Sequence, residues 1–559
     1  MPQVPAYRTK GSRGCILLMT VHFMIGGRET QPMPTFAAID IGSNSSRLKI
    51  ASVVQHRLKT LHEDREVTRL GESVFQTGMI SPEAMANTIK ALRRFHKAVQ
   101  LHVVDKVRVV ATSAMRDARN AAAFIEWVKS STGWDVEIIS GLEEGRLIHL
   151  GVVTHEPGAK GRCLMIDLGG GSCEVTLSDA GLVKNMVSLP LGAVRLQQEF
   201  LQRDPPMKED IVRLKQYIDR ELQRGEKKLG RPHVPLVIAT SGTAAALAEA
   251  SVAMSAKLPV RKTLPKMVAK TGTRAFVRFK PELATTADVR RLADKLVKMT
   301  NAEREAVPGI GPRRSEIIIG GAQVYATLLE RFGLKGFRYS PLGLRDGMLA
   351  QMLGEVDLRA EVHRKIESER WAGVLVVCKR YGIDQKKAEP VRLHATQLFD
   401  ALVKVHELPV DYRLWLQSAA MMYEVGKFMN HQGHHRHTQY IIANSEIFGF
   451  SPEQRQIVAA IARYLGKTRP NPEDRPMRGI PVEQHRLVER AVVLLRLAVA
   501  LNQDRASAVV GLKTSVYPKN VVLDIVPGRG GAKLELWAVT KEAGYFREVF
   551  GRDLVVEAV

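Results

Sequence analysis

Cysteine is scarce in this sequence. The chain of 559 residues has four cysteines, Cys15, Cys163, Cys173 and Cys378, and no two of them form a CxxC pair. This spacing excludes a disulfide framework of the kind found in small secreted domains, and it excludes a cysteine-rich zinc module. A reducing cytoplasm is therefore the expected location.

Long apolar runs are missing as well. No stretch reaches the roughly eighteen apolar residues that a membrane-spanning helix needs, so we expect no membrane partner. Basic residues before Cys15–Ile25 superficially resemble a signal peptide, but His22 interrupts the apolar stretch and no small-residue cleavage site follows. We interpret residues 1–34 as a disordered extension or the result of a mis-assigned start codon, with Met33 as the candidate start. A signal peptide is the alternative.

Acidic residues are too few to balance the basic ones. The sequence has 58 Asp and Glu against 82 Lys and Arg, which gives a formal net charge of +24. This excess favours a polyanionic partner, such as nucleic acid, an anionic membrane or polyphosphate. The sequence lacks an RNP motif, zinc-finger spacing and a basic region with heptads. We therefore expect no nucleic-acid partner.

One glycine-rich motif dominates the chain. In Leu164–Thr176 an apolar run ends at Asp167, three glycines and a serine follow, and a second apolar run begins. The pattern predicts two strands joined by a tight turn, whose backbone N–H groups can approach phosphate oxygens closely. We expect Gly169, Gly170, Gly171 and Ser172 to bind phosphate, with Asp167 beside them to hold a metal ion or a water. A purely structural hairpin is the alternative.

A near-copy of this motif occurs earlier. Phe36–Ile50 again reads as strand, aspartate, glycine, serine and strand, and the Asp40 position matches that of Asp167. Two such hairpins indicate an internal duplication. Two loops that close on one polyphosphate from both sides are typical of the actin-like ATPase and phosphotransferase fold. The first loop adds four predicted phosphate-binding residues: Gly42, Ser43, Asn44 and Ser45.

The remaining pattern predicts the domain organisation. Strands alternate with helices up to about residue 350, which indicates an α/β arrangement, and we expect Ile317–Ala322 to form a further strand and glycine turn. Apolar residues at three- and four-residue spacing then indicate helices. Short alternating runs near the end predict a small α+β cap. The predicted ranges are 35–155 and 156–350 for two actin-like α/β lobes (ASKHA, ribonuclease H-like), 351–510 for an all-α domain and 511–559 for the cap.

Several motifs together resemble the exopolyphosphatase / guanosine pentaphosphate phosphohydrolase (Ppx/GppA) family. The motifs are Ala38–Ser45, Ala111–Arg116, Ile139–Ile148, Ile166–Ser172, Ser188–Arg195, Ser241–Thr243, Pro308–Ile310, Arg314–Ile318 and Gly343–Gly347. The resemblance implies hydrolysis of the terminal phosphate of inorganic polyphosphate, or of the 5′ γ-phosphate of pppGpp, with a divalent cation. Mg²⁺ or Mn²⁺ is expected, K⁺ is a further candidate, and the family often forms homodimers.

The resemblance also assigns a catalytic base. Glu143 and Glu144 open a predicted helix, and neighbouring helical residues point about 100° apart, so the two carboxylates cannot share one role. Either one can instead stabilise the helix N-terminus, which is the role we assign to Glu143. The second glutamate of the pair is the family's base, which implies that Glu144 takes a proton from the attacking water or aligns that water.

Other residues are candidates for substrate and metal binding. Arg116 is expected to hold a phosphate oxygen, with an ordinary surface salt bridge as the alternative. Gly242 and Thr243 are expected to contact phosphates at a helix N-terminus, with local turn capping as the alternative. Metal ligation is assigned to the carboxylates Asp40, Asp167 and Glu144. Glu316 and Arg314 fit a family motif but receive no role.

The helical region resembles the HD-like domain of the family. His394 matches the first HD histidine, but Tyr423-Glu424 stands where a His-Asp pair is expected, and the final aspartate is missing near Asn502. We therefore predict a degenerate HD-like fold without a catalytic metal. A separate histidine group either lines a polyphosphate channel or forms a solvated loop: His434, His435 and His437.

The leading functional prediction is an exopolyphosphatase. A pppGpp 5′-phosphohydrolase is the alternative within the same family. A catalytically weak regulator that binds polyphosphate or a nucleotide is a third hypothesis, which the presence of Glu144, Asp167 and Arg116 counts against. An actin-like sugar kinase is a distant fourth, because the sequence offers no recognisable sugar contacts.

Overall fold

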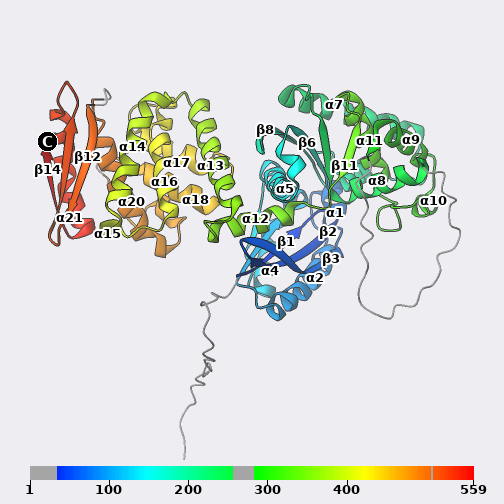
Figure 1. Ribbon diagram of the computed structural model, residues 1–559. Coiled ribbons are helices and arrows are strands. Elements are labelled where there is room, and N and C mark those ends of the chain that lie inside the picture. Colours follow the sequence, from blue (N-terminus) through cyan, green and yellow to red (C-terminus); the bar gives the residue numbers. More distant parts are fainter. Residues whose placement is uncertain (1–33, 256–282, 467, 505–507) are drawn as a thin grey trace, which may run out of the picture.

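The computed structural model describes residues 34–255, 283–466, 468–504 and 508–559. Almost all of the predicted N-terminal extension, including Cys15 and Met33, lies outside these ranges. The described residues form two lobes, a helical domain and a cap that follow one another in an elongated molecule (Figure 1). No helix in these ranges is long and apolar enough to cross a membrane.

Lobe I contains a five-stranded sheet. Its strand order is β3-β2-β1-β4-β5, in which β1, β2 and β3 form an antiparallel meander and β4 and β5 run parallel to β1. The bounds are Thr35–Ile41 for β1, Ser45–Val54 for β2, Arg57–Val67 for β3, Lys106–Ala111 for β4 and Val136–Ile138 for β5.

Lobe II repeats this topology. Its sheet has the order β10-β11-β9-β6-β7-β8, so that β8-β7-β6-β9-β11 corresponds to the five strands of lobe I and β10 is an addition at the edge. Both predicted aspartate–glycine hairpins and the internal duplication are confirmed. The bounds are Cys163–Leu168 (β6), Cys173–Asp179 (β7), Leu182–Leu189 (β8), Leu236–Thr240 (β9), Ala284–Thr285 (β10) and Gly336–Tyr339 (β11).

Helices cover both faces of the lobe I sheet. Alternate residues of β1 point to opposite faces. Ala37 and Ile39 pack against α1 (Leu70–Thr77), α2 (Pro82–Leu101), α3 (Ser113–Asp117) and α4 (Ala121–Thr132). Phe36 and Ala38 lie in the core that contains α5 (Gly141–His155) and α12 (Leu344–Val356).

The position of α12 shows that lobe I is discontinuous in sequence. This helix follows the last strand of lobe II, yet its buried Met348 and Met352 share a core with Phe36 and with Leu147 of α5. The range 156–350 that was assigned to lobe II therefore ends in a helix that packs on lobe I. The two lobes are connected by two chain crossings.

Lobe II has its own set of helices. They are α6 (Ala193–Phe200), α7 (Lys208–Leu229), α8 (Ser241–Ser255), α9 (Thr286–Leu296), α10 (Asn301–Glu305) and α11 (Ile318–Arg331), and the 3₁₀ turn η1 (Pro157–Lys160) precedes the lobe. The prediction of a strand and glycine turn over Ile317–Ala322 is wrong, because this segment begins α11. A Cβ on Gly320 would lie 2.9 Å from Leu196 Cβ, and one on Gly321 would lie 2.5 Å from Thr243 Cγ2. These glycines permit close helix packing rather than a turn.

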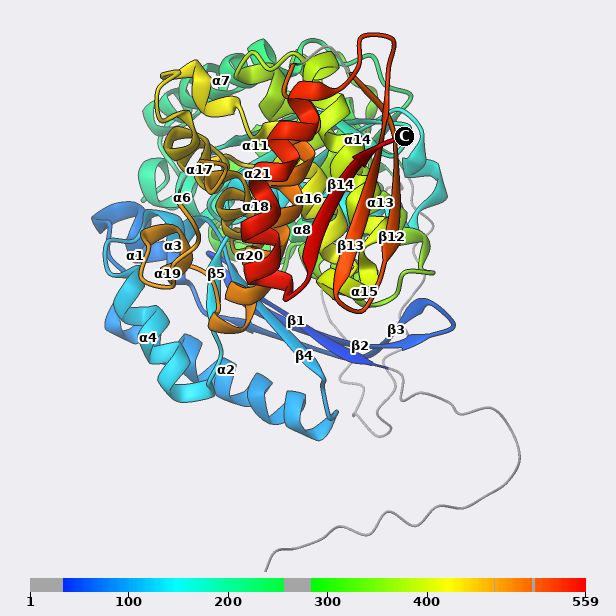
Figure 2. The ribbon, with the colours of Figure 1, turned by 90° about the vertical axis from the view of Figure 1, so that its left-hand side faces the viewer.

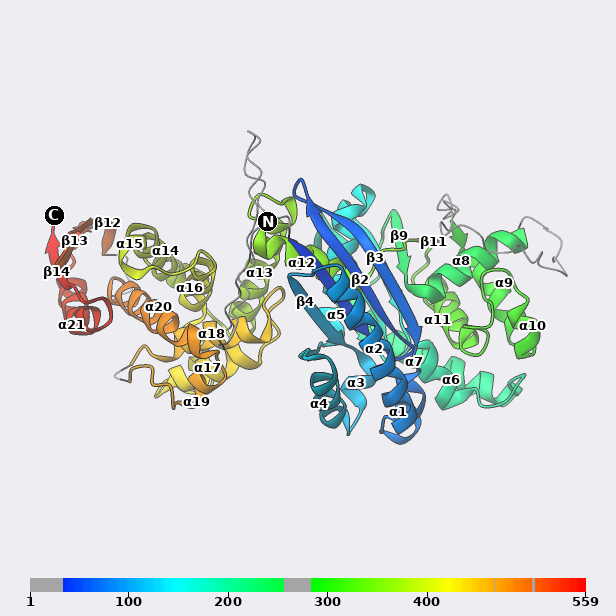
Figure 3. The ribbon, with the colours of Figure 1, turned by 90° about the horizontal axis from the view of Figure 1, so that it is seen from below.

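The helical domain and the cap share one apolar core. The helical domain consists of α13 (Glu361–Arg380), α14 (Gln385–Ala401), α15 (Val403–His406), α16 (Asp411–Met422), η2 (Val425–Phe428), α17 (His434–Asn444), α18 (Pro452–Arg463), α19 (Arg475–Arg478) and α20 (Val482–Ala500). The cap consists of β12 (Val509–Val516), β13 (Asn520–Pro527), α21 (Lys533–Phe550) and β14 (Asp553–Ala558). Figure 2 shows the molecule from its cap end, with the cap in front, and Figure 3 shows the helical domain between the cap and the lobes. The all-α domain and the α+β cap are confirmed.

Candidate active site

The two glycine turns meet between the lobes. One joins β1 to β2 and the other joins β6 to β7. A Cβ on Gly170 would lie 3.0 Å from Ser43 Cβ and 3.2 Å from the backbone nitrogen of Asn44. Because a larger residue would push the turns apart, glycine at this position allows the lobes to approach. The duplication thus places both aspartate–glycine motifs at one site.

Part of each turn is occupied by its own hydrogen bonds. The N–H of Gly42 donates to the carbonyl of Ser45 at 3.2 Å, and the N–H of Gly169 donates to the carbonyl of Ser172 at 3.0 Å. These two amides are not free to bind phosphate, contrary to the prediction. Ser43 Oγ is also engaged, since it accepts a hydrogen bond from the N–H of Ala114 at 3.2 Å.

A cavity of about 930 Å³ lies beside the turns. Nine of the predicted site residues line it: Asp40, Asn44, Ser45, Glu144, Asp167, Gly169, Gly170, Gly242 and Thr243. The other predicted residues, Gly42, Ser43, Gly171, Ser172 and Arg116, are not part of this lining. Only part of each turn therefore lines the cavity: Asn44 and Ser45 in the first turn, and Gly169 and Gly170 in the second.

Five arginines from both lobes also line the cavity: Arg47, Arg65, Arg313, Arg314 and Arg345. Within the described ranges, none of them forms an ion pair with a carboxylate. Burial and the neighbouring charge of Arg47 lower the pKa of Arg65 to about 9 and that of Arg314 to about 10. Cations that destabilise one another in a shared cavity need an anionic ligand, and guanidinium groups match phosphate geometry well.

A group of buried carboxyl groups faces these arginines. Burial and the nearby carboxylate of Glu174 raise the pKa of Glu144 well above its ordinary value. Burial and the charge of Asp167 raise the pKa of Glu174 to about 7. The pKa values of Asp40 and Asp167 are raised as well, chiefly by burial. A glutamate whose pKa is raised by burial is suited to general base catalysis.

Arg116 holds Glu144 in place. Its Nη1 donates to Glu144 Oε2 at 3.1 Å and to the carbonyl of Ile139 at 2.8 Å, and its Nη2 donates to Ser172 Oγ at 3.3 Å. One guanidinium thus connects the glutamate to the second glycine turn. This ion pair does not lie on the surface, because Arg116 is half-buried and its partner Glu144 is 8% exposed. The phosphate contact of Arg116 stays a prediction.

The N-terminus of α8 completes the cavity wall. Ser241 begins this helix with φ of 75°, a left-handed conformation that is unfavourable for a residue other than glycine. Thr240 just before it donates a hydrogen bond to Asp167. A Cβ on Gly242 would lie 1.4 Å from Nη2 of Arg314, so the guanidinium of Arg314 rests directly on this glycine. The missing side chain at Gly242 therefore lets an arginine lie next to a helix N-terminus.

Two further motif residues have structural contacts. Glu316 pairs with Arg69 of lobe I at 3.2 Å, which connects the lobes. Asp346 accepts a hydrogen bond from Lys49 Nζ at 2.7 Å and one from the N–H of Gly343 at 2.9 Å, and so joins the start of α12 to lobe I. Both Asp346 and Arg345 of this motif line the cavity.

The sequence interpretation missed the lining residues Arg47, Arg65 and Arg313, and it missed Glu174, which lies behind the lining. Arg47 is the cross-strand neighbour of Asp40, and Glu174 is the cross-strand neighbour of Asp167. A charged residue inside an otherwise apolar strand was the available signal for Glu174. Arg65 and Arg313 gave no such signal, since Arg65 stands in a strand rich in exposed charge and Arg313 in a basic loop.

The carboxyl groups are compatible with a divalent cation. Glu174 Oε2 is buried without a hydrogen-bond partner. The neighbouring carboxylates raise the pKa values of Glu144 and Glu174. Among the described residues, however, no three His, Cys, Asp or Glu side chains are arranged to chelate a metal alone. Mg²⁺ commonly binds through one or two carboxylates and takes its other ligands from phosphate and water. The donor set fits that mode.

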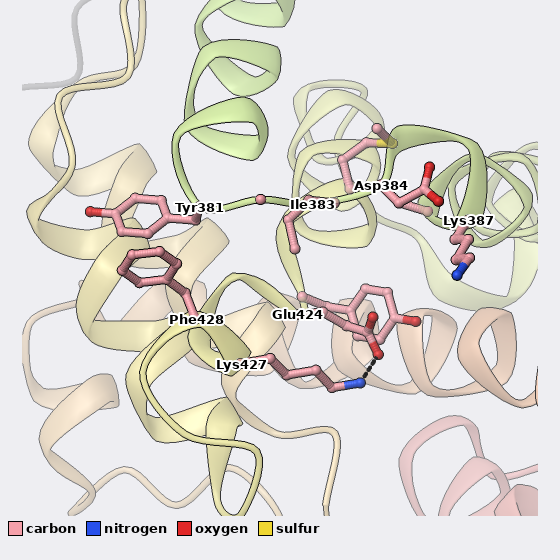
Figure 4. Close-up of a pocket in the computed structure, with 11 residues that line it drawn as sticks. Tyr381, Ile383, Asp384, Lys387, Glu424, Lys427 and Phe428 are labelled. Atoms are coloured by element: carbon pink, nitrogen blue, oxygen red, sulfur yellow. Dashed lines mark hydrogen bonds and ion pairs between the residues drawn. The ribbon is translucent and has the colours of Figure 1, made fainter.

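A second cavity, of about 370 Å³, lies in the helical domain (Figure 4). Tyr381 and Phe428 stand edge-to-face at one side, and Glu424 forms an ion pair with Lys427 at the other. His394 does not line this cavity. The structure therefore does not bring the HD-like residues His394 and Glu424 together there. His434 and His435 begin α17 with their rings 5.7 Å apart.

Comparison with known proteins gives consistent matches. The model of the Ppx/GppA phosphatase family matches residues 49–356, and the model of Ppx/GppA phosphatase domain III matches residues 370–525. The crystal structure of an exopolyphosphatase from Cytophaga hutchinsonii is 28% identical, covers 57% of this chain and 98% of its own, and has a TM-score of 0.50. A Ppx/GppA family member from Aquifex aeolicus is 29% identical, covers 58% of this chain and 98% of its own, and has a TM-score of 0.46.

Proposed function

Because the chain belongs to the Ppx/GppA phosphatase family, we propose that it is an exopolyphosphatase, which hydrolyses the terminal phosphoanhydride bond of inorganic polyphosphate. The observation that carries the proposal is the set of five arginines without carboxylate partners around one cavity. Positive charges that converge on one cavity repel one another unless a ligand compensates their charge. A chain of phosphates supplies that charge along the whole cavity.

The proposed reaction uses Glu144 as the base. Its carboxylate lines the cavity and is fixed by Arg116 at 3.1 Å. It takes a proton from the attacking water, or aligns that water, as the terminal phosphoryl group leaves the chain. The guanidinium groups of Arg47, Arg65 and Arg314 neutralise charge on the phosphate oxygens, which favours the transition state. Asn44 and Thr243 supply further hydrogen bonds from the cavity wall.

The proposal includes a divalent cation, Mg²⁺ or Mn²⁺. Asp40, Asp167 and Glu144 are the residues that would hold it, together with Glu174, whose Oε2 has no hydrogen-bond partner. When bound, the cation would neutralise phosphate charge. A monovalent cation such as K⁺, a homodimer and a cytoplasmic location are also part of the proposal.

The test is phosphate release from long-chain polyphosphate and from pppGpp, with Mg²⁺ and with a chelator. Metal-dependent release from polyphosphate supports the proposal. Release from pppGpp alone would replace it with a pentaphosphate phosphohydrolase. No release from either substrate, with tight polyphosphate binding, would identify a binding regulator instead.

A further inference from the structure

The first turn of α5, which carries Glu144, is held from outside by the helical domain. Ser140 is the N-cap of α5, and its Oγ accepts a hydrogen bond from the N–H of Glu143 at 3.0 Å. The same hydroxyl donates to Glu446, which lies between α17 and α18. The start of the helix with the proposed base is therefore tied to a residue more than three hundred positions further along the chain.

A second contact lies two residues after Glu144. Arg146 is 1% exposed and donates from Nε and Nη2 to both carboxylate oxygens of Glu143, at 2.8 Å each. Its Nη1 donates to Glu369 Oε2 of α13 at 3.0 Å, and its Nη2 also donates to Gln351 of α12. The guanidinium thus joins the first turn of α5 to two helices that come after lobe II.

These contacts flank Glu144 on both sides along the helix. Glu369 is 5% exposed, and its charge is compensated by Arg146, which hydrogen-bonds to it, and by the nearby Lys365. Charge-assisted hydrogen bonds with two donors from one guanidinium fix direction as well as distance. A first turn held at residues 140, 143 and 146 leaves the Glu144 side chain little freedom other than toward Arg116 and the cavity.

We infer that Glu369 and Glu446 are positioning residues, through which the helical domain fixes the first turn of α5 and the orientation of Glu144. The inference rests on the proposed function for its catalytic consequence. Neither residue lines the cavity, so neither is expected to contact the substrate. The helical domain would then contribute to hydrolysis without touching polyphosphate.

The test compares three variants of the full-length protein with a matched control. Glu369→Gln and Glu446→Ala are expected to lower kcat on polyphosphate roughly tenfold or more with KM unchanged, because misplacing a catalytic group slows chemistry. Glu446→Gln keeps an acceptor oxygen for Ser140 and is expected to restore wild-type kcat. The control, Asp400→Asn, breaks an exposed ion pair with Arg413 inside the helical domain, whose two bonds are 2.7 Å each, and is expected to leave kcat unchanged.

A second measurement separates this inference from the proposed function. Amide hydrogen exchange over residues 141–147 is expected to become faster in Glu369→Gln and Glu446→Ala, and to stay unchanged in Glu446→Gln and Asp400→Asn. If the wild-type protein releases no phosphate from any substrate, the proposed function fails, and the exchange rates alone decide whether the helical domain holds α5. Unchanged exchange and unchanged kcat in both disruptive variants would overturn the inference, as would an equal fall in kcat in the control.

Discussion

At the scale of single residues, the environment of Glu144 leads to the most direct prediction. Glu144→Gln keeps the size of the side chain and can still accept from Arg116, but it cannot take a proton. We expect kcat on polyphosphate to fall roughly 10²- to 10⁴-fold, the range typical of a lost general base. Polyphosphate binding, measured by filter retention or calorimetry, is expected to be largely unchanged, because the arginines of the cavity remain.

The matched control is Glu126→Gln, an exposed glutamate on α4 of the same lobe. It is expected to keep wild-type turnover. Wild-type turnover in Glu144→Gln would remove Glu144 from the mechanism.

The pH dependence of activity follows from the two coupled glutamates. Burial and mutual repulsion raise the pKa of Glu144, and the pKa of Glu174 is raised to about 7. Both are protonated below their raised pKa values, so the base form is lost and kcat/KM falls as the pH drops through the raised pKa of Glu144. Glu174→Gln removes the neighbouring charge and therefore lowers the pKa of Glu144. The acidic limb of the kcat/KM profile is expected to move to lower pH in this variant.

The comparison needs a second profile, since the apparent pKa values belong to the pair. Glu126→Gln should leave the acidic limb where it is in the wild type. A limb that stays in place in Glu174→Gln, or that moves to higher pH, would contradict the coupling.

Single residues also show how far the sequence could predict the site. The glycine motifs indicated Asp40 and Asp167, because few functions other than phosphate binding require two copies of an aspartate followed by a glycine turn. Arg47 and Arg65 could not be found in this way. They lie on strands among other charged residues, and only the folding of β2 and β3 beside α12 makes their charges converge on one cavity.

At the scale of elements, the contact between α8 and the arginines gives a binding prediction. In Gly242→Ala the new methyl group would occupy the position of Arg314 Nη2, 1.4 Å away, so the guanidinium must move. Losing a charge-assisted contact costs about 1.5–3 kcal/mol, which corresponds to a rise in KM of roughly ten- to a hundredfold. The melting temperature should change little, because the displaced atoms are the end of a flexible side chain.

Gly158→Ala is the control for this variant, because a Cβ at Gly158 meets nothing within 4 Å. Equal KM values for the two alanine variants would show that Arg314 does not bind the substrate.

The glycine that opens α6 leads to a different outcome. A Cβ on Gly192 would lie 2.2 Å from the carbonyl carbon and 2.3 Å from the nitrogen of Gly171, both of which are backbone atoms of the second glycine turn. Backbone cannot give way as a side chain does, so Gly192→Ala is expected to destabilise the protein by about 1–3 kcal/mol. Denaturant unfolding measures this change, and Gly158→Ala is again the reference. A stability equal to that of the reference would mean that the second glycine turn can move away from Gly192 at no cost in free energy.

Helices and strands were predicted correctly where the hydrophobic periodicity and the length of a segment indicated the same element. Prediction was poorer where a glycine could serve either a turn or close helix packing. The hairpins at Asp40 and Asp167 combine apolar alternation with a turn, and both are present. Ile317–Ala322 has the same appearance, yet α11 begins at Ile318, and Gly320 and Gly321 serve close contact with Leu196 and Thr243. That requirement comes from neighbours distant in sequence.

At the scale of the whole molecule, the charge excess predicts how activity responds to salt. The net charge is +24, and the cavity holds five arginines without carboxylate partners among the described residues. Salt screens such interactions, and the loss of affinity grows with the number of phosphates in contact. We expect log KM to rise with log salt more steeply for long-chain polyphosphate than for tripolyphosphate. Equal slopes would indicate that only the terminal phosphates contact basic groups.

The discontinuity of lobe I has a consequence for folding during synthesis of the protein. Phe36 and Ala38 are made early, but Met348 and Met352, which help to cover them, lie beyond the whole of lobe II. On the ribosome, at about 5–20 residues per second, the first lobe therefore waits for tens of seconds with one apolar face uncovered. Met165 and Ile238 of lobe II lie in the same core as Met348 and Met352. Both halves of the duplication therefore finish folding only when α12 emerges.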